Sequence, residues 1–396
     1  MKPIEIKKDI FWLGAIDWNL RDFHGYSTEK GSTYNAYLVM GEKKALFDTV
    51  KAEFADEFIR DIKSVLGERK LDYIISNHAE MDHSGALPAV MESFHPDKII
   101  VTKAGQDALN RHFHGNNRPF ELIKEGDELS LGDKTVQFYG SAMIHWPESM
   151  ISLLREYRVL ISNDIFGQHW ATSERFADEV DQGELHWQAA KYYANIFLPT
   201  SPAVKKFLEK LEVKGLQYDM VAPDHGLIWR NNLTEIMKAY KAWSNWETKP
   251  KAIVIYDTMW ESTAKMARAI MHGLSGEGVS ARLFDLRTNH RSDIMTELLD
   301  ARAVILGSSI LNSGILPKMA DMITYMKGLR PTNKIGASFG SYGWKNTITK
   351  MLNEQLEEMK IELADEGISV QYVPEENDLR KCFELGQKIR NMILAK

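Results

Sequence analysis

Cysteine is almost absent from this chain of 396 residues, which contains only Cys382. A single thiol excludes an intrachain disulfide framework, thiolate-bound zinc and a cysteine-ligated iron–sulfur cluster. Any metal that the chain binds must therefore be held by nitrogen and oxygen atoms.

Long apolar runs and an excess of basic charge are also missing. No stretch of about 18 uncharged apolar residues predicts a membrane-spanning helix. The N-terminal stretch MKPIEIKKD lacks the apolar core of a signal peptide. The net charge of −6 is spread along the chain without a basic stripe, which argues against nucleic acid as a partner. We therefore expect a cytoplasmic protein that binds neither membranes nor nucleic acid.

The length of the chain predicts two domains, because a single hydrophobic core stops growing at about 250–300 residues. Its apolar content of 44% and charged content of 26% are ordinary for a globular protein. The sequence pattern changes near residue 248, where a polar junction at residues 243–250 ends in Pro250. We predict one domain at residues 1–248 and a second at residues 249–396.

The two halves differ in their predicted secondary structure. Before the junction, short strands at residues 44–50, 98–103, 135–141 and 150–155 alternate with turns and with helices at 54–66 and 201–211. After it, strands at 252–256, 281–285, 303–307, 334–339 and 370–373 alternate with helices at 262–274, 293–300, 317–327, 347–360 and 376–394. This alternation predicts an α/β fold with a doubly wound parallel sheet in the second half.

Potential metal ligands follow four apolar runs of the first half, which end near residues 77, 139, 163 and 224. Imidazoles and carboxylates at strand ends suit a divalent metal, because the strand holds them rigidly while the following loop leaves coordination positions open. Four histidines and three carboxylates are enough for two metals. The predicted ligands are His78, Glu80, Asp82, His83, His145, Asp164 and His225.

Three loops of the second half are candidates for binding a mononucleotide. In a doubly wound sheet, ligands lie beyond the carboxyl ends of the strands, where the first loop offers hydroxyls and free helix amides to a phosphate monoester. Glycines in the other two loops let the backbone approach a planar ring, on which Trp260 or Trp344 could stack. The predicted binding residues are Thr258, Met259, Trp260, Glu261, Ser262 and Thr263; Ser308, Ser309, Ile310, Leu311, Asn312 and Gly314; and Ser341, Tyr342, Gly343 and Trp344.

The first loop contains neither G-x-G-x-x-G nor G-x-x-x-x-G-K-[ST], so neither a dinucleotide nor a P-loop triphosphate is indicated. One hydroxyl-rich loop alone usually only caps a helix. Because all three loops follow predicted strands, a flavin site is the better interpretation.

The ligand spacing and the order of the two domains resemble the flavodiiron protein family. His78-x-Glu80-x-Asp82-His83 is followed by 61 residues before His145, 18 before Asp164 and 60 before His225. The resemblance spans nearly the whole chain and is closest to the two-domain A type, the rubredoxin:oxygen oxidoreductase branch. Stretches shared with that branch are GAIDWN at 14–19, TYNAYL at 33–38 and YYAN at 192–195.

This resemblance implies a metallo-β-lactamase-like αβ/βα sandwich followed by a flavodoxin-like domain that binds FMN. It also implies two non-haem irons bridged by an oxo or hydroxo group, which reduce O2 to water or NO to N2O. One iron would take His78, Glu80 and His145, the other Asp82, His83 and His225, and Asp164 would bridge them. Zinc hydrolases of this fold carry His-x-His-x-Asp-His, whereas Glu80 adds an anionic donor here.

The resemblance further implies roles for His24 and Tyr193, either of which could donate a hydrogen bond or a proton to the bound diatomic gas. It implies a head-to-tail homodimer in which the FMN of one subunit meets the diiron site of the other. Because the chain has no Cys-x-x-Cys module, electrons would come from a separate carrier such as rubredoxin, or from a reduced deazaflavin.

Two other functions would keep part of this pattern. A dinuclear zinc hydrolase with an appended flavodoxin domain would use the same fold. Glu80 argues against it, and so does the first of the three loops, at residues 257–263, which we call the phosphate loop. An electron carrier whose first domain only docks partners would need none of the seven ligands. We therefore predict a flavodiiron oxidoreductase, with the preference between O2 and NO left open.

Overall fold

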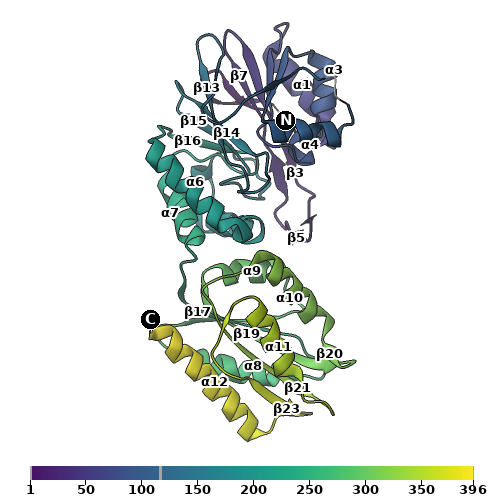
Figure 1. Ribbon diagram of the computed structural model, residues 1–396, viewed down its shortest axis with the longest axis vertical. Helices are drawn as coiled ribbons and strands as arrows, with labels where there is room; N and C mark the ends of the chain where they lie inside the picture. The colour runs from purple at the N-terminus through teal and green to yellow at the C-terminus, as the bar shows by residue number, and fades with distance from the viewer. Residues whose placement is uncertain (1, 116–117, 396) are drawn as a thin grey trace. The chain divides into compact units, whose positions relative to one another are not determined.

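A computed structural model describes residues 2–115 and 118–395 of the chain. These residues form two compact units (Figure 1). The first contains the chain up to His24 together with Thr28–Tyr192 and Thr200–Lys241. The second contains Gly25–Ser27, Tyr193–Pro199 and the chain from Ala242 onward.

The first unit is built on two sheets. One has the strand order β1-β2-β7-β8-β9-β10-β11 and the other β12-β13-β14-β15-β16, while β3 pairs with β6. The strands are β1 (Ile4–Lys7), β2 (Ile10–Trp12), β3 (Ala15–Asp17), β4 (Asp22–Phe23), β6 (Ser32–Tyr34), β7 (Tyr37–Met40), β8 (Lys44–Phe47), β9 (Tyr73–Ile75), β10 (Lys98–Val101), β11 (Phe120–Leu122), β12 (Glu128–Ser130), β13 (Thr135–Gly140), β14 (Met150–Leu154), β15 (Val159–Asn163) and β16 (Met220–Pro223).

The two sheets pack face to face, and helices cover them on the outside (Figure 1). Phe47 of the first sheet and Phe138 of the second belong to one buried core between the sheets. Ile74 on the opposite face of the first sheet packs in a second core with Ile62 of α1 (Ala55–Leu66). The alternation of side chains along each strand thus supplies both cores.

Helices α6 (Ser201–Lys214) and α7 (Leu233–Ser244) contact the second sheet and its loops. Lys210 donates a hydrogen bond to the Gly140 carbonyl at 2.6 Å, and the Tyr240 hydroxyl accepts one from the Phe166 N–H at 3.0 Å. The layers are therefore helix, sheet, sheet, helix. The other helices before the junction are η1 (Ala52–Phe54), α2 (Met81–Ser84), α3 (Leu87–Phe94), α4 (Lys103–His112), η2 (Ala177–Glu179), α5 (Gln182–Tyr192) and η4 (Leu198–Thr200).

The second unit contains a sheet of order β18-β17-β19-β21-β22, in which β20 pairs with β19 and β23 with β21. The ladders of β17 with β18 and β19, and of β21 with β19, β22 and β23, are parallel. Its elements are β5 (Tyr26–Ser27), η3 (Tyr193–Phe197), β17 (Lys249–Tyr256), α8 (Ser262–Leu274), β18 (Ser280–Asp285), α9 (Arg291–Leu299), β19 (Ala301–Leu311), β20 (Gly314–Ile315), α10 (Pro317–Leu329), β21 (Ile335–Tyr342), α11 (Ile348–Glu358), β22 (Glu362–Leu363), β23 (Ile368–Gln371) and α12 (Glu376–Leu394).

This strand order places α8 and α12 on one face of the parallel sheet, where Ile270 and Ile389 share a buried core with Ile305. β17, the first strand of this sheet along the chain, lies between β18 and β19, so the chain crosses to both sides of it. The predicted fold class, an αβ/βα sandwich followed by a doubly wound parallel sheet, is confirmed.

The second predicted flavin loop begins later than the sequence pattern indicates. β19 continues to Leu311 because its pairing with β21 extends to Ser309 opposite Ser341, after which Ile310 pairs with Ile315. The prediction that a loop begins at residue 308 is therefore wrong. The prediction that the third loop begins at residue 340 is wrong for the same reason, because β21 continues to Tyr342. Polar residues at a strand end look like a loop in sequence, although their backbones stay in the ladder.

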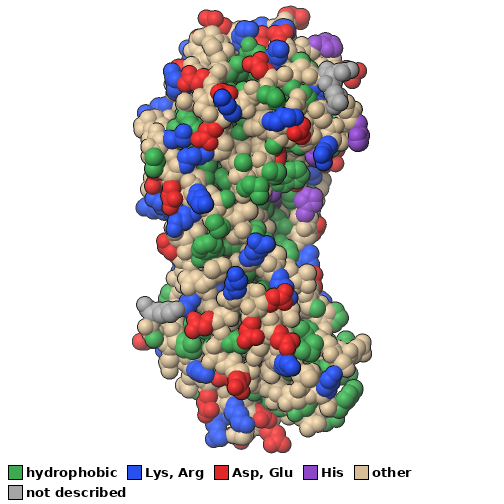
Figure 2. Space-filling view, viewed as in Figure 1, with side chains coloured by type: hydrophobic (Ala, Val, Ile, Leu, Met, Phe, Trp, Pro, Cys, Tyr) green, Lys and Arg blue, Asp and Glu red, His purple; other side chains and the backbone are tan. Residues whose placement is uncertain are grey.

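The surface carries both signs of charge. On the face drawn in Figure 2, basic and acidic side chains are intermixed. Within residues 2–115 and 118–395, no helix has both the length and the hydropathy of a membrane span.

Candidate metal centre and flavin site

The seven predicted ligands come from the ends of four strands in the first unit. β9, β13, β15 and β16 each run into a loop that carries one or more of them. Their donor atoms form two groups, and within each group these atoms lie within 4.8 Å of one another. One group is His78, Glu80, His145 and Asp164, and the other is Asp82, His83 and His225.

Asp164 faces both groups with one carboxylate oxygen toward each. Its Oδ2 lies 3.3 Å from Nε2 of His78 and 3.4 Å from Nε2 of His145. Its Oδ1 lies 3.2 Å from Nε2 of His83 and 3.4 Å from Nε2 of His225. A carboxylate in this position can bridge two cations, one in each group.

Backbone anchors fix the loop that follows β9. The buried Asp48 carboxylate accepts hydrogen bonds from the N–H groups of Asn77 and His78 at 2.8 and 3.2 Å. The N–H and the hydroxyl of Thr49 both donate to the His83 carbonyl, at 2.8 and 2.7 Å. Because these hydrogen bonds hold the backbone before and within α2, the ligand side chains of this segment start from fixed backbone positions.

Two ligand imidazoles are oriented by a hydrogen bond on the ring nitrogen that points away from the site. Nδ1 of His78 lies 2.7 Å from Oε1 of the buried Glu148, which also accepts the Ala79 N–H at 3.1 Å. Nδ1 of His225 lies 2.6 Å from the Thr33 carbonyl oxygen. Such bonds place the ring proton on Nδ1, so that Nε2 is left as a metal donor.

Several buried polar atoms in the middle of the site have no hydrogen-bond partner among the described residues. They are both carboxylate oxygens of Asp82 and Oδ1 of Asp164. In addition, Nε2 of His83 and Nε2 of His225 face each other at 3.1 Å. Leaving charged oxygens buried without a partner is costly, whereas cations between these donors would satisfy them. The residues therefore fit a pair of divalent metal ions.

The site also favours ionised carboxylates. Burial opposes the ionisation of Glu80, but His145 and His78 outweigh it and lower the pKa of Glu80 to about 2. Burial also raises the pKa of Asp82, but the attraction of His83 and His225 outweighs burial, so the pKa of Asp82 lies below its ordinary value. The site thus presents anionic oxygen donors at neutral pH, which suits ferrous iron.

His24 lies at the exposed edge of the first group. Its Nε2 is 3.6 Å from Oε1 of Glu80, and 76% of its side chain is exposed. The other oxygen of Glu80, Oε2, lies 3.2 Å from Nε2 of His78 and 3.0 Å from Nε2 of His145. Glu80 therefore connects an exposed imidazole with the buried donor group.

Tyr193 belongs to the second unit, where it opens the π-helical segment η3. It is fully buried, and its ring centroid lies 5.2 Å from that of Trp243 and 6.0 Å from that of Phe197. Its role toward a bound gas stays a prediction.

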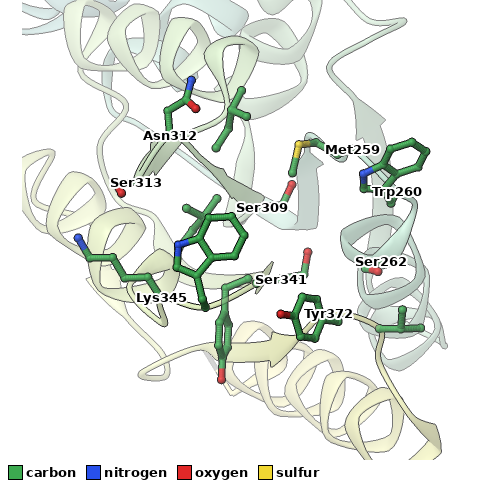
Figure 3. A pocket seen from close by; sticks show the side chains of 15 residues that line it. Met259, Trp260, Ser262, Ser309, Asn312, Ser313, Ser341, Lys345 and Tyr372 are labelled. Atoms are coloured by element: carbon green, nitrogen blue, oxygen red, sulfur yellow. The ribbon is translucent and has the colours of Figure 1, made fainter.

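A cavity of about 570 Å³ opens in the second unit at the carboxyl ends of the strands (Figure 3). In Figure 3, Ser309 and Ser341 lie between the segments that carry Trp260 and Lys345. Trp260 and Trp344 are 88% and 91% exposed, so their rings are available to cover a planar ligand. The predicted residues that line the cavity are Met259, Trp260, Ser262, Ser309, Ile310, Leu311, Asn312, Ser341, Tyr342, Gly343 and Trp344.

Two buried hydroxyl groups are available to a ligand, one in the phosphate loop before α8 and one near the end of β19. Oγ1 of Thr258 and Oγ of Ser309 are buried and have no hydrogen-bond partner among the described residues. α8 begins at Ser262, so the N–H groups of its first turn are also open to an acceptor. A phosphate monoester would satisfy these donors, and the residues therefore fit a flavin mononucleotide.

The remaining predicted flavin residues do not line the cavity. The Thr263 hydroxyl lies 3.1 Å from that of Ser341, and both are buried. The Ser308 hydroxyl donates to the Ser309 carbonyl at 2.9 Å and accepts the Leu316 N–H at 3.2 Å, so it is used inside the protein. The others outside the lining are Thr258, Glu261 and Gly314.

Sequence reasoning did not single out several residues of these sites. Glu148 stands three positions after His145, but nothing in its spacing shows that it meets His78 instead. Lys345 lies within the third predicted loop but was not named as a binding residue, and Tyr372 lies at the end of the last parallel strand. The rule that ligands bind at the carboxyl ends of strands was a signal for Tyr372 as well.

Two family models match the chain: one described as ODP family beta lactamase over residues 33–226, and flavodoxin over residues 254–386. Fold and site thus define a protein that joins a β-lactamase-like metal-binding domain to a flavodoxin domain. The chain is 44% identical to nitric oxide reductase of Moorella thermoacetica, over 98% of both chains. It belongs to the flavodiiron protein family.

Solved structures agree with this assignment. The structure of rubredoxin oxygen:oxidoreductase from Desulfovibrio gigas has a TM-score of 0.97 and 43% identity, covering 100% of this chain and 99% of that chain. The flavodiiron protein from Giardia intestinalis has a TM-score of 0.96 and 29% identity, covering 100% of this chain and 97% of that chain. The flavodoxin domain indicates FMN as a cofactor, and the two donor groups indicate a diiron centre.

Proposed function

We propose that this protein is an oxidoreductase that reduces O2 to water, NO to N2O, or both, at a non-haem diiron centre that receives electrons through FMN. The observation that carries the proposal is the position of Asp164 between two groups of nitrogen and oxygen donors. Relatives named as an oxygen oxidoreductase and as a nitric oxide reductase support the two gases.

In this proposal each metal receives two imidazoles and one terminal carboxylate. His78, Glu80 and His145 hold one iron; Asp82, His83 and His225 hold the other. Asp164 gives one oxygen to each. His83 belongs to the set because its Nε2 is directed at Asp164 and at His225 rather than away from them.

When bound, two ferrous ions and a reduced FMN together supply four electrons, which convert O2 and four protons to two waters. Two of these electrons are enough to convert two NO and two protons to N2O and water. Asp164 sets the spacing that lets both metals meet one substrate. Aromatic rings wall the site: the Trp146 ring lies 5.4 Å from that of His78, and the Phe23 ring lies 6.3 Å from that of His225. These rings limit the entry of water.

His24 and Glu80 provide a route for protons to the site. Protons must reach a buried centre from solvent, and the exposed Nε2 of His24 faces Oε1 of Glu80. We assign His24 to deliver protons at this oxygen, and Tyr193 to donate a hydrogen bond toward the bound gas.

The proposed domains are residues 1–248 for the diiron site and 249–396 for FMN. The exposed rings of Trp260 and Trp344 support a head-to-tail homodimer, because a partner subunit would cover them and bring its irons near the flavin. The proposed electron donor is rubredoxin or a similar small carrier, and the proposed location is the cytoplasm.

A dinuclear zinc hydrolase remains the alternative reading of the fold. Glu80 speaks against it, because this acidic donor lies 3.0 Å from Nε2 of His145 inside the first donor group. The buried hydroxyls of Thr258 and Ser309, which have no hydrogen-bond partner among the described residues, also indicate a bound ligand in the second unit that hydrolysis would not require.

The test is turnover by the holoprotein with chemically reduced rubredoxin, in a mixture prepared without oxygen. A known amount of O2 or of NO is then added separately to portions of one preparation, and the consumption of the two gases is compared. We expect donor-dependent loss of at least one gas. A protein that contains zinc, hydrolyses esters or lactams and consumes neither gas would support the hydrolase instead.

A further inference from the structure

Glu261 adopts a backbone conformation in the phosphate loop that glycine usually provides. It stands at the N-cap of α8 with φ +65° and ψ 0°. This left-handed region disfavours side chains with a Cβ, and the default residue there is glycine. A glutamate at this position therefore calls for a reason that lies in its side chain.

The Glu261 side chain is fastened to the loop after the neighbouring strand. Oε1 of Glu261 accepts a hydrogen bond from NH1 of Arg287 at 2.9 Å. Arg287 also donates to Asp285 through Nε, at 3.0 and 3.1 Å, and through NH2 at 2.6 Å. Asp285 ends β18, and its Oδ2 lies 3.3 Å from the Tyr256 hydroxyl at the end of β17. Arg287 thus ties together the loops at two adjacent strand ends.

The ion pair between Arg287 and Glu261 matters for an anionic ligand, because the surrounding loop carries negative charge. The phosphate of FMN is a dianion near neutral pH, and the phosphate loop itself carries Asp257 and Glu261. All three nitrogens of the Arg287 guanidinium donate to carboxylates, so its charge is compensated by Glu261 and Asp285. Without Arg287, the Glu261 carboxylate would be free to turn toward the phosphate and repel it.

We infer that Arg287 is a positioning residue of the flavin site, which holds the Glu261 carboxylate away from the FMN phosphate and so sets the affinity for the phosphorylated flavin. The inference rests on the proposed FMN site and adds a residue that is not among those lining the cavity. It predicts an effect on FMN but not on riboflavin, which has the same ring and no phosphate.

The experiment measures the dissociation constants of FMN and riboflavin for the full chain after flavin removal, by quenching of flavin fluorescence. Arg287→Gln should weaken FMN binding roughly tenfold, as expected for a charge repulsion of this kind. Its riboflavin affinity should stay unchanged. The control is Arg282→Gln, which changes an exposed arginine on β18, the strand before the Arg287 loop, and which should bind both flavins as the parent chain does.

A second variant separates repulsion by Glu261 from a direct bond between Arg287 and phosphate. In the repulsion account, Glu261→Gln combined with Arg287→Gln regains the FMN affinity that Arg287→Gln alone loses. If the double variant stays as weak as Arg287→Gln, or if riboflavin weakens as much as FMN, the inference is overturned. Failure of the parent chain to bind FMN at all would instead overturn the proposed function.

Discussion

Oε1 of Glu148 lies 2.7 Å from Nδ1 of His78, and both side chains are buried. A carboxylate in this position holds the imidazole in one orientation and makes Nε2 a stronger donor. The corresponding nitrogen of His225 meets neutral groups, the Thr33 carbonyl at 2.6 Å and the Ser32 hydroxyl at 3.5 Å. The two imidazoles therefore differ in their support, because a carboxylate lies behind His78 and only neutral groups lie behind His225.

Glu148→Gln should weaken the binding of one iron of the pair. Loss of the charge lowers the donor strength of His78, and the expected decrease in metal affinity is about 10- to 100-fold. Iron retained per chain during titration with a chelator measures the effect. Glu156→Gln is the matched control, because Glu156 also accepts a backbone N–H, that of Thr135, but lies in an exposed turn between β14 and β15. Equal retention in the two variants would refute the role of Glu148.

Asp164→Ala should remove iron and gas reduction while leaving FMN in place. The side chain faces four ligand imidazoles, so its loss affects both donor groups, whereas the flavin cavity belongs to another unit. Iron content, flavin absorbance and turnover are measured on one preparation. Asp219→Ala, which removes a surface ion pair with Lys7, should behave as the parent chain. Retained turnover in Asp164→Ala would contradict the assignment.

His24→Gln should lower turnover without removing iron. Its imidazole lies beside Glu80 but is largely exposed, so the variant loses proton delivery and keeps the ligand set. A decrease on the order of a hundredfold is typical when a general acid is removed. The rate at saturating gas and the iron content are compared with those of His272→Gln, an exposed histidine of α8. Full turnover with full iron content would exclude the proton role.

Lys334 is a buried lysine of the flavodoxin domain whose charge the fold disfavours. Burial lowers the pKa of Lys334 to about 7, despite the opposing attraction of Asp300. Its Nζ donates to the Leu299 carbonyl at 3.1 Å. In the unfolded chain the lysine keeps its proton up to its ordinary pKa of 10.5. The unfolded state therefore binds more protons between about pH 7 and 10.5, and stability rises with pH across this window by at most about 1.4 kcal/mol per unit.

Lys334→Met should remove this pH dependence. The variant should melt at a higher temperature than the parent chain near pH 6, and its advantage should shrink as the pH approaches 10. Thermal unfolding across this pH range is the measurement, with Lys350→Met on the exposed side of α11 as the control. A difference in melting temperature that does not vary with pH would show that Lys334 stays charged in the folded protein.

The sequence was most informative where function and periodicity coincide. Ligands such as His78 and Asp164 follow short apolar runs, and the helices at 262–274 and 376–394 lie at the predicted residues. It was least informative where distant segments meet. Glu148 reaches His78 across 70 positions, and Arg287 reaches Glu261 across 26. No local pattern encodes such pairs, because only the packing of the fold brings them together.

Strand ends were the other source of error. Ser309 and Ser341 look like loop residues because they are small and polar, yet they pair with each other in the sheet. Their hydroxyls can serve a ligand only because the backbone is held by the ladder. The predicted chemistry of these residues does not depend on the error in their secondary structure.

The most direct test of the diiron account is the product that the fully loaded, fully reduced protein makes after the electron donor is removed. The account predicts that O2 is consumed at about one molecule per chain without release of H2O2, or that NO is converted to N2O. FMN-loaded Asp164→Ala should do neither. Formation of H2O2 in proportion to the O2 consumed, with the same yield from both proteins and no N2O from NO, would contradict it.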